Sequence, residues 1–268
     1  MNISRVVATG PSEARNPLSA ATDRVWVVAR KDIRDLVSGK FYIYLIFICL
    51  ICLPYFDSAR NAVNELSKQG MSASDVRLAA QSFLDTMAYT LPVMLAMLLC
   101  SVFASYAILM DKTKRAFESL LATPLSLKQI WMGKTIGVAL PGMAVGIVVS
   151  LAAMVAIDLA IIAPVAGSAV APAALPIVSA LVISPILVFL AVMLISLLQL
   201  IMTNPRIPSF AFTVIFMAIY ATTVIMKVSS GWNFGLTYLM AAIVIGIALT
   251  FLSRFLTNER TVLSSKGQ

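Results

Sequence analysis

The chain alternates between long apolar runs and short polar connections. A membrane-spanning helix needs about 20 mostly apolar residues, because the hydrocarbon core of a bilayer is about 30 Å thick. Six runs come close to this length or exceed it, and we interpret each as a transmembrane helix. Because backbone polar groups must be satisfied inside the bilayer, the predicted fold class is an all-α integral membrane protein. Its transmembrane domain covers residues 41–253, with spans at residues 41–56, 86–110, 135–163, 173–202, 209–226 and 236–253.

The segment before the first span has the pattern of an amphipathic helix. Over residues 22–40, Trp26, Ile33 and Leu36 fall on one side of a helix and most of the charged residues fall on the other. Such a helix suits the surface of a membrane, with the Trp ring at the depth of the head groups. Residues 1–40 are therefore predicted to form a polar tail and a membrane-surface helix. The alternative is a short helix packed on another protein surface.

Two regions depart from the simple pattern of apolar spans and short connections. Residues 57–85 carry mixed charge and are predicted to form an external hairpin of two short helices, the second capped by Ser74. Residues 173–202 are longer than one crossing needs. Pro176 and Pro185 therefore predict either a kink in this span or a lead-in helix before it.

The distribution of charge predicts the orientation of the chain. It is 60% hydrophobic and 12% charged, whereas soluble domains are about half apolar and about a quarter charged. Of the 20 Lys and Arg residues, 16 fall in segments assigned to the inside, among them residues 1–40 and the tail at 254–268. Lys and Arg accumulate in cytoplasmic segments. Both termini of this multi-pass cell-membrane protein are thus predicted to be cytoplasmic, and the net charge of +8 needs no nucleic acid partner.

The longest charged connection between spans is residues 111–134, with the sequence DKTKRAFESLLATPLSLKQIWMGK. Its first part, residues 111–122, is predicted to be a short helix with an apolar side. Thr123-Pro124 ends that helix, because Pro disfavours helical geometry in the residue before it. Ser126 and Gln129 then have the spacing of a capping box that begins the next helix. The simpler alternative is a basic loop whose only role is to set topology.

This segment resembles the one that follows the second membrane helix in ABC-2 type permeases, the membrane subunits of ABC transporters. The resemblance lies in its apolar and acidic residues, in the Thr-Pro step, in Ile130 and in Gly133-Lys134, and also in its position between the second and third of six predicted spans. In that family the segment is a coupling helix that docks on the ATP-hydrolysing subunit. The residues that the resemblance places at this interface are Phe117, Glu118, Leu120, Leu121, Thr123 and Pro124.

The resemblance implies a permease subunit of an exporter that is not itself an enzyme. ATP and Mg²⁺ would be bound by a separate ATPase chain, and two permease subunits, identical or different, would pair in the membrane. The predicted amphipathic helix corresponds to the elbow helix of that family. Lipid, drug, peptide, glycan and ion substrates all fit this reading. Two other classes stay open, namely a secondary transporter without an ATPase and a membrane scaffold or assembly factor.

Other motifs point less clearly to chemistry. Gly133-Lys134-Thr135 resembles the end of a phosphate-binding loop, but the pattern requires a glycine at position 128, which is Lys128. Cys49 and Cys52, with nearby Met residues and Cys100 on the second span, could supply soft ligands for Cu(I). We favour plain packing, because Cys and Met are ordinary apolar residues in membrane helices. No metal or cofactor site is therefore predicted on this chain.

Two polar residues within the apolar spans are candidates for a transport pathway. An ionisable residue inside a membrane is costly and often marks such a path. Asp158 lies in the third predicted span and Gln199 in the fourth. Asp158 is also near the predicted outer boundary, so a position in contact with water is the favoured alternative.

Overall fold

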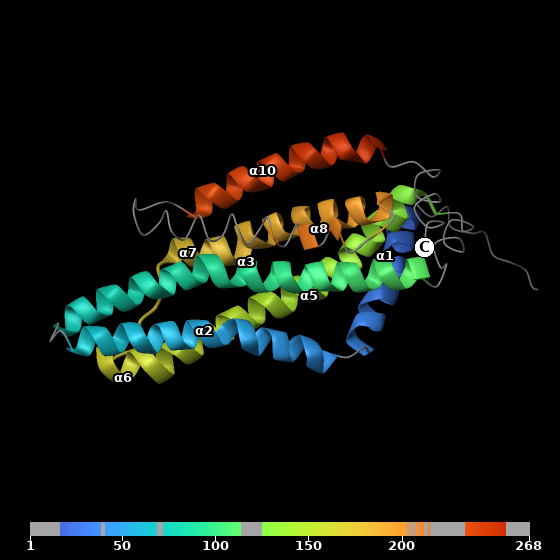
Figure 1. The fold of residues 1–268 in the computed structure, drawn as a ribbon. Helices are drawn as coiled ribbons and strands as arrows, with labels where there is room; N and C mark the ends of the chain where they lie inside the picture. Colours follow the sequence, from blue (N-terminus) through green and yellow to red (C-terminus); the bar gives the residue numbers. More distant parts are fainter. Residues whose placement is uncertain are drawn as a thin grey trace, which may run out of the picture.

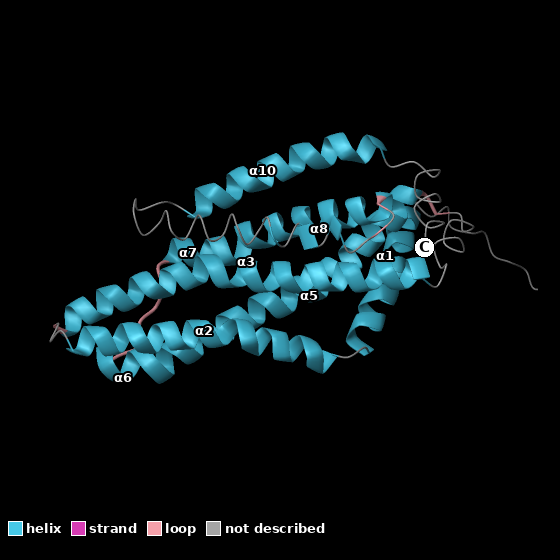
Figure 2. Cartoon of the chain, viewed as in Figure 1, coloured by secondary structure: helices cyan, strands magenta, loops and turns pink. Residues whose placement is uncertain are grey.

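The structure is a computed structural model that describes residues 17–38, 41–68, 72–113, 125–202, 204, 207–208, 210–211, 214 and 234–255. Within those residues the regular structure is entirely helical, without a strand (Figure 2). The α-helices are α1 (Pro17–Ser38), α2 (Phe41–Lys68), α3 (Ala73–Thr113), α5 (Leu127–Ile157), α6 (Ala163–Ala166), α7 (Ala174–Val178), α8 (Ser184–Ile201) and α10 (Phe234–Leu252). Two π-helices, η1 (Asp158–Ile162) and η2 (Ser179–Ile183), and a 3₁₀-helix, η3 (Ser253–Phe255), continue them.

Four of the described helical segments are long and apolar enough to cross a membrane: Ser74–Ile108, Leu127–Ala166, Ala174–Ile201 and Phe234–Leu252. Each satisfies the length that a bilayer requires, and together they indicate a multi-pass membrane protein. They correspond to the second, third, fourth and sixth predicted spans. The first predicted span, residues 41–56, is the N-terminal part of α2 and is not among the four. The fifth, residues 209–226, lies mostly outside the described residues, so six spans stay a prediction.

The external hairpin predicted for residues 57–85 is wrong in its details. The helix α2 continues to Lys68 and α3 begins at Ala73, so the described part of this polar region belongs to two long helices and not to a separate short pair (Figure 1). Hydropathy detects the part of a helix that lies in hydrocarbon and says little about where the helix ends. Ser72, rather than Ser74, caps the start of α3, because its carbonyl oxygen accepts hydrogen bonds from the backbone N–H groups of Asp75 and Val76.

Four other expectations about local structure are resolved by the described residues. The helix α1 begins at Pro17, earlier than predicted, and Pro suits the first helical turn. Asp111 belongs to the last turn of α3 and does not begin a new helix. The lead-in segment before the fourth span is continuous with it, because α7 passes through η2 into α8 without a break. The predicted capping box is confirmed, since Ser126 Oγ accepts from the Gln129 N–H at 3.3 Å and Gln129 Oε1 accepts from the Ser126 N–H at 2.9 Å.

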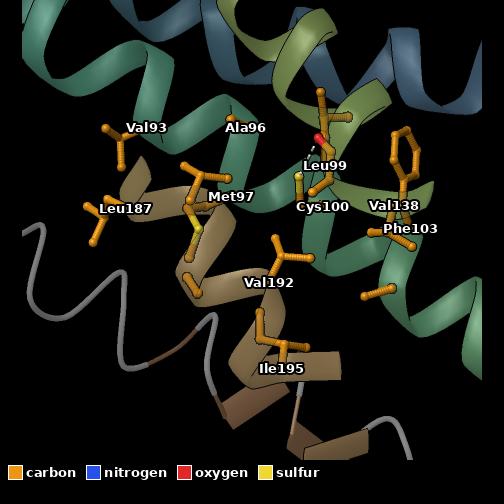
Figure 3. Packing of buried hydrophobic residues seen from close by; sticks show 14 of the residues in the cluster. Val93, Ala96, Met97, Leu99, Cys100, Phe103, Val138, Leu187, Val192 and Ile195 are labelled. Atoms are coloured by element: carbon orange, nitrogen blue, oxygen red, sulfur yellow. Dashed lines mark hydrogen bonds between the residues drawn. The ribbon is translucent and has the colours of Figure 1, made fainter. Parts of the chain in front are cut away.

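The central helix of the bundle is α3, which packs against α5, α8 and α2 and makes its most extensive contact with α5. Figure 3 shows the main apolar core, where residues of α3 face residues of α8 and α5. The burial of this core holds the helices together by close packing, which drives helix association in lipid. The labelled members include Val93, Met97, Cys100 and Phe103 from α3, Val138 from α5, and Leu187, Val192 and Ile195 from α8.

Close approach of α3 and α5 depends on two glycines of α5. A Cβ atom at Gly146 would lie 2.7 Å from the Cα and backbone nitrogen of Ala96, and one at Gly142 would collide with Cys100. Small residues four apart allow helix backbones to approach in membranes. Gly142 and Gly146 therefore allow α5 to pack directly against the backbone of α3.

Polar contacts between helices add to the packing of α8 and α10 in the bundle. The indole N–H of Trp131 on α5 donates to the carbonyl oxygen of Met193 on α8 at 3.2 Å. The hydroxyl group of Tyr238 on α10 donates to the carbonyl oxygen of Tyr89 on α3 at 3.1 Å. These contacts fix the positions of α8 and α10 along the bundle, and α1 crosses one end of it at a steep angle (Figure 1).

Candidate functional site

The described residues contain a buried cluster of charged side chains at the end of the bundle where α1 crosses it. Lys134 of α5 is 1% exposed, and its ammonium group contacts the carboxylates of Asp111 on α3 and Asp32 on α1. The distance from Lys134 Nζ to Asp32 Oδ2 is 3.4 Å, and the contact with Asp111 Oδ2 is the closer of the two. We refer to Asp32, Asp111 and Lys134 as the charge cluster. It joins three helices at one point.

Two further glycines of α5 explain how α1 comes so close. A Cβ atom at Gly133 would lie 2.7 Å from the Cβ of Val28, and one at Gly137 would lie 2.9 Å from the Cβ of Asp32. These two glycines flank Lys134, so α1 and α5 touch through their backbones around the lysine. The Asp32 carboxylate therefore reaches Lys134 because Gly133 and Gly137 carry no side chain that would hold α1 away from α5.

The cluster holds more negative than positive charge until Lys31 is included. Lys31 Nζ on the more exposed side of α1 lies 3.9 Å from Asp111 Oδ1. Burial raises the pKa of the Asp32 carboxyl group, and the adjacent Lys134 ammonium group opposes this rise. Asp111 is thus the carboxylate that contacts both lysines, whereas Asp32 contacts Lys134.

Two members of the charge cluster lie at the two ends of the charged connection at residues 111–134. Asp111 lies in the last turn of α3, which ends at Thr113 just before residues 114–124, and Lys134 lies about two turns into α5, after them. The capping box at Ser126 fixes where α5 begins. Both ends of the connection are thus tied to each other and, through Asp32, to α1. Any displacement of one end acts on the buried ion pair between Asp111 and Lys134. Because separating a buried ion pair is costly, the other end is expected to move with it.

The residues predicted for the elbow helix divide between two environments. Leu36 is buried and belongs to the main core, Ile33 is half-buried, and Trp26 is 51% exposed. The side of α1 that packs on α5 is formed by Val28, Ala29, Asp32 and Leu36. The packed side is thus rotated from the predicted apolar side and includes an acid. The exposed Trp26 stays available for a membrane surface.

The residues predicted for the ATPase-coupling interface lie outside the described residues, namely Phe117, Glu118, Leu120, Leu121, Thr123 and Pro124. The two pathway candidates are described. Gln199 is fully buried on α8. Asp158 is half-buried in η1, and its Oδ1 accepts the backbone N–H of Val170 at 3.1 Å. Asp158 therefore holds the loop before α7 in place, and its position relative to the membrane boundary stays a prediction.

Among the described sulfur-containing residues, Met97 and Cys100 are buried in the main apolar core, and Cys52 packs against that core. Cys49 is exposed and Cys52 half-buried on α2, whereas Cys100 is buried on α3 and its thiol donates to the carbonyl oxygen of Ala139 at 3.8 Å. Met94 on α3 accepts a hydrogen bond from the Tyr55 hydroxyl group at 3.5 Å. Across the described ranges, no set of three or more His, Cys, Asp or Glu residues is placed to hold a metal ion.

Sequence reasoning missed the charge cluster, because it assigned Lys134 to a basic cytoplasmic connection. One feature of the sequence could have indicated that Lys134 is buried. Gly133 and Gly137 have the four-residue spacing of a close helix contact, and Lys134 lies inside an apolar run between them. A lysine there requires acidic partners, and Asp32 and Asp111 are acids beside predicted helices.

Comparison with known proteins gives no assignment. No protein-family model matches this chain, and no curated protein matches it.

Proposed function

We propose that this chain is the permease subunit of an ATP-driven exporter of the ABC-2 type. The proposal includes six spans, cytoplasmic termini, a second permease subunit and a separate ATPase that binds ATP and Mg²⁺. It is supported by the resemblance of residues 117–134 to a coupling segment and by the four apolar helices long enough to cross a membrane. The observation that carries it is the charge cluster, which ties both ends of residues 114–124 to the elbow helix.

The cluster gives the segment a mechanical connection to the membrane helices. Asp111 is on α3, Lys134 is on α5 and Asp32 is on α1, so a pull on the segment acts on three helices together. If the ATPase pulls on residues 114–124, α3 and α5 move as a pair and α1 moves with them. Buried ion pairs and close packing favour discrete arrangements over gradual deformation. ATP-driven closure would thus shift the bundle between inward-open and outward-open states.

The glycine contacts support movement of this kind. Gly133 and Gly137 place the backbone of α1 directly on α5, whereas Gly142 and Gly146 place the backbone of α3 on the next part of α5. The helix α5 thus connects the elbow helix to the central helix without long side chains between them. A displacement at the Lys134 end therefore reaches the core beside Cys100.

The experiment is co-expression with the ATPase encoded next to this chain, followed by pull-down and by measurement of ATP hydrolysis. Phe117→Ala and Glu118→Ala should weaken ATPase association or uncouple hydrolysis from transport, because a docked helix depends on a few anchors worth about 1–3 kcal/mol each. Lys112→Ala is the matched control outside the proposed interface. The coupling role is wrong if both interface variants behave like the wild type while Lys112→Ala does not. Transport by the chain without an ATPase would instead identify a secondary transporter.

A further inference from the structure

A cavity of about 840 Å³ lies against α1 on the side away from α5. Its described lining contains three cations, one acid and two apolar residues, all from α1. Arg30, Lys31 and Arg34 are exposed, and they share one side of the helix with Val27 because the four positions follow helical spacing. The cavity is open along α1, so it presents these side chains to a molecule that lies beside the helix. The lining residues are Val27, Arg30, Lys31, Ile33, Arg34 and Asp35.

We propose that this cavity binds the phosphate-bearing head group of an anionic membrane lipid. Two guanidinium groups and an ammonium group around one space favour a phosphate, and Arg can donate two parallel hydrogen bonds to it. Val27 and Ile33 supply apolar surface for the part of the lipid next to its phosphate. Trp26 directly precedes the lining residue Val27 in the sequence, and its side chain is 51% exposed. Trp is enriched at the boundary between head groups and hydrocarbon.

The position of α1 favours a lipid over a soluble anion. The helix crosses one end of the bundle steeply, as a helix lying on a membrane surface does when the other helices span it (Figure 1). Basic pockets at this depth are known sites for anionic head groups. The inference rests on the membrane placement included in the proposed function, and it does not require the ATPase.

Lys31 links this site to the charge cluster. Its ammonium group lines the cavity and also lies 3.9 Å from Asp111 Oδ1. A phosphate in the cavity competes with Asp111 for Lys31. Lipid binding therefore weakens one contact of Asp111 and leaves it paired with Lys134, which alters the connection between α1 and α3.

The test uses the full chain, purified in neutral detergent without any ATPase. Binding of phosphatidylglycerol and of phosphatidylcholine is measured by native mass spectrometry, and thermal stability is measured with each lipid. We expect phosphatidylglycerol to bind more tightly and to raise the melting temperature more. Arg30→Gln with Arg34→Gln should weaken phosphatidylglycerol binding about 30-fold, as expected for two cations near a lipid surface.

Matched variants separate a specific site from general attraction. Arg60→Gln with Arg77→Gln removes two exposed arginines elsewhere and should leave phosphatidylglycerol binding unchanged. Asp35→Asn removes the one acid of the lining and should strengthen binding about threefold. Equal weakening by both arginine pairs, or no weakening by the Arg30 and Arg34 pair, would overturn the proposal. If that pair does not fold, an unchanged affinity in Asp35→Asn would overturn it.

Inorganic phosphate is the control for the source of the anion. Phosphate at millimolar concentration should compete weakly with phosphatidylglycerol and should not raise the melting temperature by itself. Stabilisation by inorganic phosphate equal to that by the lipid would assign the cavity to a soluble anion and contradict the lipid assignment. Because no ATPase is present, failure here leaves the coupling proposal standing, and failure of the ATPase pull-down leaves this one standing.

Discussion

Replacing Lys134 by Met tests whether the charge cluster stabilises the bundle. Met keeps most of the side-chain volume, so the change removes the charge without leaving a large cavity. Lys134 is 1% exposed and contacts two carboxylates, both largely buried, which the variant would leave without their shared cation. Removal of one partner from a buried ion pair costs about 3–5 kcal/mol.

That free energy converts to a measurable shift. At about 2–4 °C per kcal/mol for a chain of this size, we expect Lys134→Met to lower the melting temperature by roughly 6–20 °C. The measurement is the loss of the monodisperse peak in size-exclusion chromatography after heating in detergent. Lys128→Met is the control, because Lys128 lies on the same helix and is exposed; it should change the melting temperature by less than about 2 °C.

A rescue variant distinguishes charge from shape. Lys134→Met combined with Asp32→Asn and Asp111→Asn removes all three charges, so no uncompensated charge is left buried, and that buried charge is the source of the cost of Lys134→Met. We expect this triple variant to recover most of the lost stability. A wild-type melting temperature in Lys134→Met alone, or no recovery in the triple variant, would refute the role assigned to the cluster.

Three further predictions use other parts of the structure. Gly137→Ala should destabilise the bundle by about 1–3 kcal/mol, because its Cβ would lie 2.9 Å from the Cβ of Asp32 and 3.0 Å from a backbone oxygen of α1; Gly246→Ala, whose Cβ meets nothing within 4 Å, should show no loss in the same thermal assay. Burial raises the pKa of Asp32, so its contribution to stability is present below its ordinary pKa and is lost as pH rises through the raised value; Asp32→Asn should therefore gain stability relative to the wild type as pH rises above the ordinary Asp value of about 4, and a constant difference would contradict this. In a Cys-free background, a cysteine at Ser72 should react with an impermeant reagent from outside and one at Ser126 should not, and the reverse pattern would overturn the predicted orientation.

Features that depend on near neighbours in the chain were predicted well. The capping box at Ser126 and Gln129 was predicted because both partners lie within one helical turn. Four of the six predicted spans match helices that can cross a membrane, because hydropathy over about 20 residues measures the property that the bilayer selects. The ends of those helices were predicted poorly. Polar residues at 57–85 continue α2 and α3 beyond the apolar part, and helix propensity alone does not mark that limit.

The charge cluster could not be predicted because its members are far apart in the sequence. Asp32 and Lys134 are 102 positions apart, and Asp111 and Lys134 are 23 apart. Along the chain each is one charged residue among others beside an apolar run. Only the packing of α1 on α5, permitted by Gly133 and Gly137, brings the three together. The rotation of α1, which buries Asp32 and exposes Trp26, likewise depends on that contact.

The order of the cluster residues along the chain has a consequence for biosynthesis. The two carboxylates come first, at Asp32 and Asp111, and the lysine comes last, at Lys134. As a chain is made from its N-terminus, α1 and α3 reach the membrane while both acids still lack their shared cation. The arrival of α5 then supplies the positive charge and its glycine surface in the same step. We expect membrane quality-control proteases to degrade a chain that ends before α5. A chain that includes α5 should be degraded more slowly.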